Sequence, residues 1–461
     1  MISTDASPAA SGRQYLPITA PQSPNQSLVP LTAAVNDRDR LEIGGCDVVE
    51  LVERFGSPLY ILDEQTVRKA CQQYRDGLQQ HYPGESLAIY ASKAWNCLAV
   101  CALVASEGLG IDVASGGELY AALQAGVGAE KIYFHGNNKS VAELKEAIAC
   151  GCTIVADNWL ELKTIANLAA RPVRVMLRIT PGIECHTHEY IRTGHLDSKF
   201  GFDPTQVAPV LEFLHQQPHL EGIGLHAHIG SQIFERQPHQ DLADVLADWI
   251  QKGRALGLPL GELNVGGGLG ICYIEADDPP AIAEWTELVA KAVAKACQDR
   301  QLDLPKLICE PGRSLVGSAG ITVYRVGGRK EVPNIRNYVA VDGGMSDNAR
   351  PITYQAVYRG VVASRMSAPA TETITVAGKH CESGDVLLRD ALLPAMQPGD
   401  VLAILATGAY NYSMASNYNR LPRPAAVLVN AGEAATIVER ETYRELIGQD
   451  RLPARLQAGI R

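Results

Sequence analysis

Short apolar runs alternate with stretches of helical period along most of the chain. Between residues 87 and 309, eight runs rich in Val, Ile, Leu and Tyr are typical of buried strands. They cover residues 87–91, 110–113, 131–134, 153–156, 173–179, 222–226, 262–265 and 306–309. Eight strands separated by helices over about 250 residues predict a TIM-like (β/α)₈ barrel. A doubly wound sheet is the alternative, but it would place a Gly-rich turn after its first strand, whereas the glycine cluster here comes late.

The pattern changes beyond residue 316. The runs become short and rich in Val, Ile, Thr and Tyr, and Gly, Pro or Asp separates most of them, which predicts an all-β C-terminal domain, a small barrel or sandwich. The predicted division is a disordered or arm-like tail over 1–37, rich in Ser, Pro and Thr, a leading segment over 38–56, the barrel over 57–315 and the β domain over 316–461. The leading segment is expected to pack with the C-terminal domain.

Composition and charge exclude several classes of function. A net charge of -10 over 461 residues argues against nucleic acid or an anionic membrane as a partner. No run of eighteen apolar residues predicts a membrane span. The first thirty residues lack a signal-peptide pattern, and the 11 cysteines form no repeating framework, so we expect a cytoplasmic protein with reduced thiols. No second cysteine pair of metal-ligand spacing is found, and no metal is predicted.

A lysine stands where a barrel keeps its chemistry. Lys93, in Tyr90-Ala91-Ser92-Lys93-Ala94, follows a predicted strand, and the carboxyl ends of barrel strands form the active-site face. Burial at such a place lowers the pKa of an amine and makes it a usable nucleophile for a carbonyl. A lysine that reaches past the strand end to solvent is the alternative interpretation.

Three further motifs close successive predicted strands. They are His226-Ala227-His228-Ile229-Gly230-Ser231, Gly266-Gly267-Gly268-Leu269-Gly270 and Glu310-Pro311-Gly312-Arg313. Consecutive glycines let backbone N–H groups approach a phosphate, to which a serine hydroxyl and a guanidinium can add. A carboxylate can keep a pyridinium nitrogen protonated, and the combination with Lys93 predicts pyridoxal 5'-phosphate. The two histidines share one strand face, so a zinc pair and a buried core histidine remain alternatives.

Together these motifs resemble the basic amino-acid decarboxylases of the alanine-racemase-like fold, over about residues 41–423. The resemblance implies a barrel followed by a β domain, in a head-to-tail homodimer whose active sites are shared between subunits. Lys93 would carry the cofactor covalently, and His228 would stack on its ring. The implied cofactor-binding residues are Lys93, Asp112, His135, His228, Ser231, Gly266, Gly267, Gly268, Glu310, Pro311, Gly312, Arg313 and Tyr410.

Within that family, the C-terminal half resembles the members that decarboxylate meso-2,6-diaminopimelate to L-lysine and CO2, the last step of lysine biosynthesis. Cys381-Glu382-Ser383-Gly384-Asp385 carries this likeness, because ornithine decarboxylases usually place Asp directly after the cysteine. The distal end of this substrate bears a carboxylate and an ammonium, which arginines and Glu382 can pair. By resemblance, Lys93 and Cys381 are catalytic, and the thiol returns a proton from the other subunit. The implied substrate-binding residues are Arg313, Arg350, Tyr354, Glu382 and Tyr410.

Other readings stay open at this point. A decarboxylase of carboxynorspermidine, arginine or ornithine is the nearest alternative, followed by a cofactor-binding regulatory protein and an alanine racemase. One local departure from the family is Gly378-Lys379-His380 before Cys381, where many relatives have a proline after the glycine.

Overall fold

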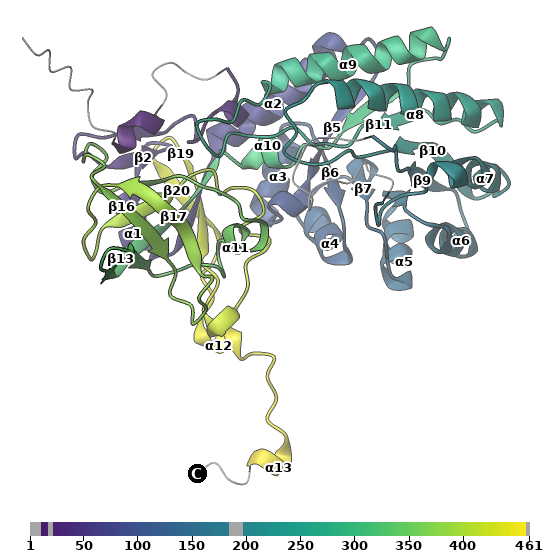
Figure 1. Ribbon diagram of the computed structural model, residues 1–461. Coiled ribbons are helices and arrows are strands. Elements are labelled where there is room, and N and C mark those ends of the chain that lie inside the picture. The colour runs from purple at the N-terminus through teal and green to yellow at the C-terminus, as the bar shows by residue number, and fades with distance from the viewer. Residues whose placement is uncertain (1–10, 17–21, 184–196, 458–461) are drawn as a thin grey trace, which may run out of the picture.

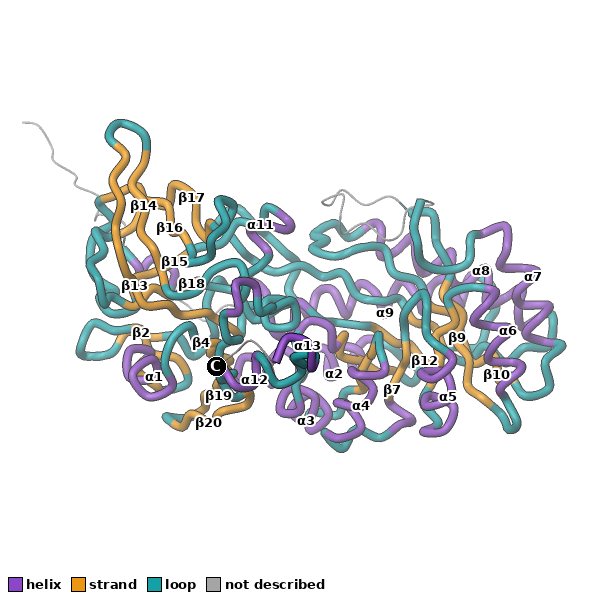
Figure 2. Tube along the Cα trace, turned by 90° about the horizontal axis from the view of Figure 1, so that it is seen from below, coloured by secondary structure: helices purple, strands orange, loops and turns teal. Residues whose placement is uncertain are grey.

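The computed structural model describes residues 11–16, 22–183 and 197–457 of the protein. Figure 1 shows two parts side by side, a barrel ringed by helices and a β-rich unit, and Figure 2 shows the same division from below. Within the described chain, no helix has the length and apolarity needed to cross a membrane.

The barrel is closed and has eight parallel strands, which confirms the predicted fold and its strand count. Each strand is buried on both faces, as expected where helices cover the outside and side chains fill the inside. The ring closes through β12 and β5, with Ile308 opposite Leu87. The strands are β5 (Ser86–Ala91), β6 (Gly110–Val113), β7 (Ile132–Phe134), β8 (Thr153–Ala156), β9 (Val173–Arg178), β10 (Leu220–His226), β11 (Glu262–Asn264) and β12 (Lys306–Cys309).

The outer helices begin at the mouth of the barrel, shortly after the strand ends. Local capping fixes several of these starts: Ser115 and Asn158 accept the N3 backbone N–H of their helices, and Ser140 forms a capping box with Glu143. The chain turns within a few residues after β6, β7 and β8, whereas longer loops follow β9, β10 and β11, and all of these connections lie at the carboxyl ends of the strands. The helices are α2 (Glu64–His81), α3 (Leu98–Ser106), α4 (Gly116–Gln124), α5 (Val141–Cys150), α6 (Trp159–Leu168), α7 (Pro204–His215), α8 (Gln237–Ala255), α9 (Ile282–Asp299) and α10 (Arg313–Val316).

The β-rich unit is built on a sheet ordered β17-β16-β14-β13-β4-β19-β20, in which β18 also pairs with β13 and β15 pairs with β18. Two of its strands, β17 and β20, were not predicted, because charged and exposed residues interrupt their apolar pattern. Its strands are β13 (Gly320–Val332), β14 (Arg336–Val341), β15 (Gly360–Val362), β16 (Glu372–Ala377), β17 (Val386–Leu393), β18 (Val401–Ile404), β19 (Ala425–Asn430) and β20 (Glu433–Val438). Short helices α11 (Arg350–Tyr354), α12 (Tyr443–Leu446) and α13 (Ala454–Gln457) accompany them.

The central strand of this sheet comes from the N-terminal part of the chain. The run β4 (Leu59–Asp63) was counted with the barrel region 57–315, but it pairs antiparallel with β13 and parallel with β19. A buried apolar run fits either sheet, so its pattern cannot assign it. The small strands β1 (Ala34–Val35), β2 (Leu41–Ile43) and β3 (Cys46–Asp47) and helix α1 (Val48–Phe55) share the apolar core of the same sheet.

The described part of the predicted tail packs on its own chain. Residues 1–10 and 17–21 lie outside the described residues, but a 3-10 turn at Pro24–Gln26 lies against the barrel. The fully buried Asn25 amide donates to the carbonyls of Gly270 (3.1 Å) and Pro280 (2.9 Å), and Ser318 Oγ donates to Pro24 O at 2.7 Å. These residues therefore brace the loop that follows β11, which their composition did not predict.

We predict that Asn25→Ala lowers the free energy of unfolding by about 1–3 kcal/mol, because two buried carbonyls lose their donor. Gln65→Ala is the matched control, since its amide bonds Asn430 at the surface (3.0 Å), and we expect a change within about 0.5 kcal/mol. Urea unfolding of both variants measures the difference. Equal losses would contradict the assignment of Asn25 as a buried anchor.

Candidate active site

A cavity of about 420 Å³ lies at the mouth of the barrel, where the β unit meets it. The structure brings most of the predicted site residues into its wall: Lys93, Asp112, His135, His228, Ser231, Gly268, Glu310, Gly312, Arg313, Arg350, Tyr354 and Tyr410. Gly266, Gly267 and Pro311 lie next to wall residues in sequence and do not line it, and Cys381 and Glu382 do not line it either.

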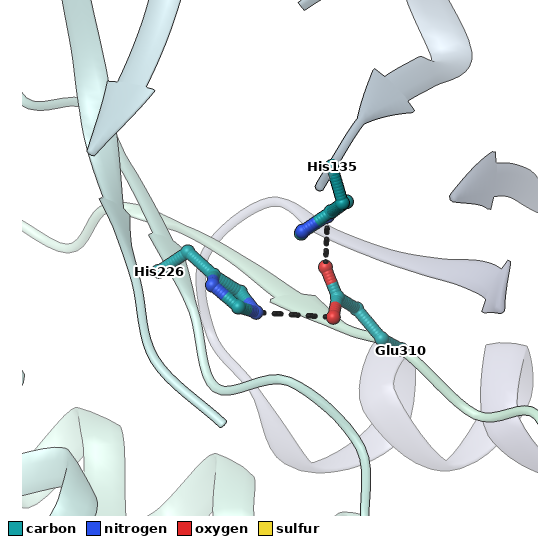
Figure 3. Close-up of side chains that lie close together, drawn as sticks. All are labelled: His135, His226 and Glu310. Carbon is teal, nitrogen blue, oxygen red and sulfur yellow. Dashed lines mark hydrogen bonds and ion pairs between the residues drawn. The ribbon is translucent and has the colours of Figure 1, made fainter. Parts of the chain in front are cut away.

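A buried carboxylate, Glu310, marks the inner end of the site. Figure 3 shows His135 and His226 pointing at it, with their Nε2 atoms 2.8 Å from Oε1 and 3.1 Å from Oε2. The Asn264 amide donates to Oε1 at 2.7 Å. Burial alone would raise the pKa of the Glu310 carboxyl, but His135 and His226 outweigh it and hold that pKa well below its usual range. Glu310 is therefore ionised inside the barrel.

His226 hydrogen-bonds this carboxylate through Nε2, whereas His228 contacts the glycine turn. Burial lowers the pKa of the His226 imidazole to about 4, so the ring is neutral and can donate from Nε2 to Glu310. Asp112, at the end of β6, is also buried, and desolvation raises the pKa of its carboxyl to about 6, with Glu310 adding to the shift. The inner end of the site thus holds one firmly ionised carboxylate and a second one that titrates closer to neutrality.

His228 lies beside the glycine turn that follows β11. The backbone N–H of Gly267 donates to its Nδ1 at 3.2 Å, and burial holds the pKa of the imidazole well below its ordinary value. The ring is thus neutral, with its proton on Nε2. A Cβ at Gly267 would lie 2.2 Å from the carbonyl oxygen of Glu310, and Gly268 has a φ of +127°, so the turn requires glycine at both positions.

Arg313 begins α10 directly after β12 and is buried. Its Nη2 donates to Ser231 Oγ at 3.1 Å, and its Nη1 donates to the Tyr273 hydroxyl at 2.5 Å. Its guanidinium carbon lies 4.9 Å from the centre of the Tyr410 ring, a cation–π distance.

Arg350 reaches the same cavity from α11 of the β unit. Its Nε donates to the Tyr358 hydroxyl at 3.0 Å, and its guanidinium lies over the rings of Tyr354 and Tyr410 at 5.0 and 5.4 Å. Among the described residues, no carboxylate lies within ion-pair distance of Arg350 or Arg313. Buried guanidiniums with only hydroxyl and aromatic partners favour anions as ligands.

The lysine turn and the β unit are tied together. The backbone N–H of Tyr410, which has a φ of +71°, donates to Ala94 O at 2.7 Å. Burial alone would raise the pKa of the Tyr410 phenol. The cations of Arg313, Lys93 and Arg350 outweigh burial, so the pKa lies below its ordinary value. The expected burial of Lys93 is not found: its side chain is exposed in this chain because it projects into the cavity.

Cys381 and Glu382 are exposed on the loop that follows β16. Asn419 Oδ1 accepts the Cys381 backbone N–H at 2.8 Å. His380, directly before the cysteine, is buried with its Nδ1 2.6 Å from Asp385 Oδ2. The loop is thus held firmly, with the thiol outside the cavity of its own chain.

Several wall residues were missed in the sequence. Arg178 ends β9, lies 4.3 Å above the Phe200 ring and lines the cavity. A charged residue at a strand end was the signal used for Lys93, and it could have identified Arg178 as well. Asn264, Tyr273 and Tyr358, which lie behind the wall, carry no local signal, because their roles depend on distant partners.

The residues present fit pyridoxal phosphate. The glycine turn, which any Cβ would obstruct, lies beside Ser231 and Arg313 and suits a phosphate. The ionised Glu310 suits a protonated ring nitrogen, and Lys93 supplies the amine for a covalent link. Because Gly267 also positions His228, the phosphate turn and the ring site are coupled.

Known proteins that are similar to this chain are also pyridoxal-dependent decarboxylases. A model of the pyridoxal-binding domain of pyridoxal-dependent decarboxylases matches residues 64–317. The diaminopimelate decarboxylases of Synechocystis sp. and Bacillus subtilis are 64% and 45% identical, over 99% and 91% of this chain and 100% and 97% of theirs. The crystal structure of the enzyme of that name from M. jannaschii, in complex with L-lysine, has 34% identity and a TM-score of 0.86, covering 94% of this chain and all of that one.

We predict that Gly267→Ala weakens binding of pyridoxal phosphate roughly tenfold or more, because its Cβ displaces the Glu310 backbone. Gly261→Ala, just before β11, is the matched control, since an added Cβ there meets nothing within 4 Å. Cofactor absorbance during titration of the two apoproteins measures the effect. Equal affinities would contradict the proposed phosphate turn.

Proposed function

The chain belongs to the diaminopimelate decarboxylases of the pyridoxal-dependent decarboxylase family, and we propose from this premise how its residues carry the reaction. It converts meso-2,6-diaminopimelate to L-lysine and CO2, in lysine biosynthesis, with pyridoxal phosphate as cofactor. The residue assignment rests on two buried guanidiniums, those of Arg313 and Arg350, which face one cavity and have no carboxylate partner in the part of the chain that the structure describes.

When bound, pyridoxal phosphate would supply an electron sink for the pair that remains when carbon dioxide leaves. Lys93 would hold it covalently, and Ser231, the glycine turn 266–268 and Arg313 would bind its phosphate. The ionised Glu310 would keep a proton at the ring nitrogen by charge and hydrogen bonding. His228 would lie against the ring face, and because it is neutral it adds no positive charge there. Asp112, His135, Pro311, Gly312 and Tyr410 complete the cofactor site.

Substrate recognition would rest on the distal end of diaminopimelate. Arg350, with Arg313, would pair the distal carboxylate, Tyr354 and Tyr410 would bind beside it, and Glu382 would take the distal ammonium. Ornithine offers no distal carboxylate and would leave a buried guanidinium unpaired, which costs several kcal/mol. Among the alternative substrates, carboxynorspermidine comes closer than ornithine or arginine.

Proton return would come from Cys381 of a second subunit. The thiol and Glu382 are exposed and do not line the cavity of their own chain, which supports a site completed by another copy. A thiol can deliver a proton where water is excluded. We therefore propose a homodimer in which each active site takes Lys93 from one chain and Cys381 from the other.

An apolar row at the barrel mouth supports the same proposal. Leu98, Tyr120, Val141 and Leu160 lie in the N-terminal halves of α3 to α6, and each is more than half exposed. Successive barrel helices start on the active-site face, so these four apolar side chains lie toward that face. Apolar patches of this kind mark protein interfaces.

We also propose a cytoplasmic location. Most of the described cysteines are buried free thiols, which suits a reducing compartment and a biosynthetic enzyme. The acidic net charge gives no support for nucleic acid or membrane partners.

Arg350→Ala tests the distal pocket. We expect kcat/KM for meso-diaminopimelate to fall at least about 30-fold, because the distal carboxylate loses a buried, charged partner. The control is Arg336→Ala, a surface arginine paired with Asp390, which should leave the kinetics unchanged. If the Arg350 variant turned over diaminopimelate like the wild type, the assignment of the distal pocket would be wrong.

Mixing two inactive variants, Lys93→Ala and Cys381→Ala, tests the shared site. Random reassortment of a dimer makes half of the molecules hybrids, each with one intact site, so we expect activity to return to roughly a quarter of the wild-type level. Lysine formation before and after reassortment measures it. Hybrids that form but stay inactive would count against shared sites.

A further inference from the structure

Two tyrosines lie behind the arginines of the active site. Tyr273 follows the glycine turn in the barrel, and Tyr358 follows α11 in the β unit. Their rings meet edge to face, with centroids 5.3 Å apart and planes at 87°. They therefore form one contact across the boundary between the two parts of the chain.

The Tyr358 hydroxyl accepts the Nε–H of Arg350 at 3.0 Å, on the inner side of the guanidinium. Within the described residues, no oxygen accepts a hydrogen bond from Nη1 or Nη2 of Arg350. The two terminal nitrogens together form the edge that pairs a carboxylate in bidentate fashion. Holding Nε thus turns the free edge of Arg350 toward a ligand.

Tyr358 is itself held in place. It is 3% exposed, and Asn411 Nδ2 donates to its hydroxyl at 3.4 Å while also donating to Thr407 O at 3.1 Å. Asn411 is fully buried next to Tyr410 in sequence. The position of Arg350 is thereby linked to the loop that carries Tyr410.

Tyr273 holds Arg313 in the same way that Tyr358 holds Arg350, by accepting a hydrogen bond from its guanidinium. Its hydroxyl accepts from Arg313 Nη1 at 2.5 Å, and its backbone N–H donates to Asp277 Oδ2 at 2.8 Å, which fixes the turn. A second cavity of about 230 Å³ adjoins the arginines, and its wall contains Tyr273, Arg313, Arg350 and Tyr354. If either hydroxyl were lost, the arginine that it holds could move into this second cavity.

We infer that Tyr273 and Tyr358 are positioning residues that set the spacing and orientation of Arg313 and Arg350 for the distal carboxylate of the substrate. This inference rests on the proposed role of Arg350. A guanidinium ordered before binding loses less conformational entropy when the carboxylate arrives, so the ordering appears as substrate affinity. The tyrosines do not touch reacting atoms, and the chemical step should be nearly indifferent to them.

The test is Tyr358→Phe in the holoenzyme. We expect KM for meso-diaminopimelate to rise roughly tenfold while kcat stays within about threefold, because one hydrogen bond to a charged group is lost. Inhibition by L-lysine, which keeps the distal carboxylate, should weaken in parallel. Inhibition by cadaverine, which has no carboxylate, should stay unchanged.

Tyr82→Phe is the matched control, since Tyr82 is equally buried and its hydroxyl donates to Pro305 O at 2.6 Å, away from the cavity. Loss of a buried hydroxyl affects stability in both variants, but only Tyr358→Phe should move KM. If Tyr358→Phe folds poorly, KM is measured in Tyr273→Phe instead, because that position is less buried.

The outcomes separate the two claims. Wild-type enzyme that does not turn over diaminopimelate overturns the proposed function. Wild-type turnover with unchanged KM and L-lysine inhibition in the tyrosine variants overturns the positioning role alone. Equal weakening of L-lysine and cadaverine also overturns it, because the effect would then not concern the carboxylate.

Discussion

The active site depends on one carboxylate that stays ionised inside the barrel. Glu310 is buried, yet His135, His226 and Asn264 surround its oxygens at 2.7 to 3.1 Å. Without these partners, burial would favour the neutral acid, which could not keep a ring nitrogen protonated. These partners lie at strand ends that are far apart in the sequence. Glu310 stays ionised because closure of the barrel brings them together around its carboxylate.

Positive charge faces this carboxylate from the other end of the cavity. Arg313 comes from the barrel and Arg350 from the β unit, and neither has a carboxylate partner among the described residues. The wall of one cavity therefore carries both an ionised carboxylate and two guanidiniums. The Tyr410–Ala94 hydrogen bond and the Tyr273–Tyr358 contact join the two parts of the chain at this point.

The sequence predicted what depends on local pattern. All eight barrel strands were placed within a few residues, because each is a short apolar run bounded by turn residues. Strand β4 falls within the range 57–315 given to the barrel but pairs in the other sheet, since pairing is a property of distant segments. Lys93 was located but expected to be buried, because exposure depends on how wide the cavity opens. Arg178, Tyr273 and Tyr358 were missed, since only the fold brings them to the site.

One measurement tests the account most directly. The purified holoenzyme is given meso-diaminopimelate, carboxynorspermidine, ornithine and arginine in parallel, and the products are identified by mass. Two buried guanidiniums that have no ion-pair partner among the described residues predict L-lysine from diaminopimelate and no product from ornithine or arginine. Turnover of ornithine or arginine without turnover of diaminopimelate would contradict it, while leaving the barrel and the Lys93 chemistry in place.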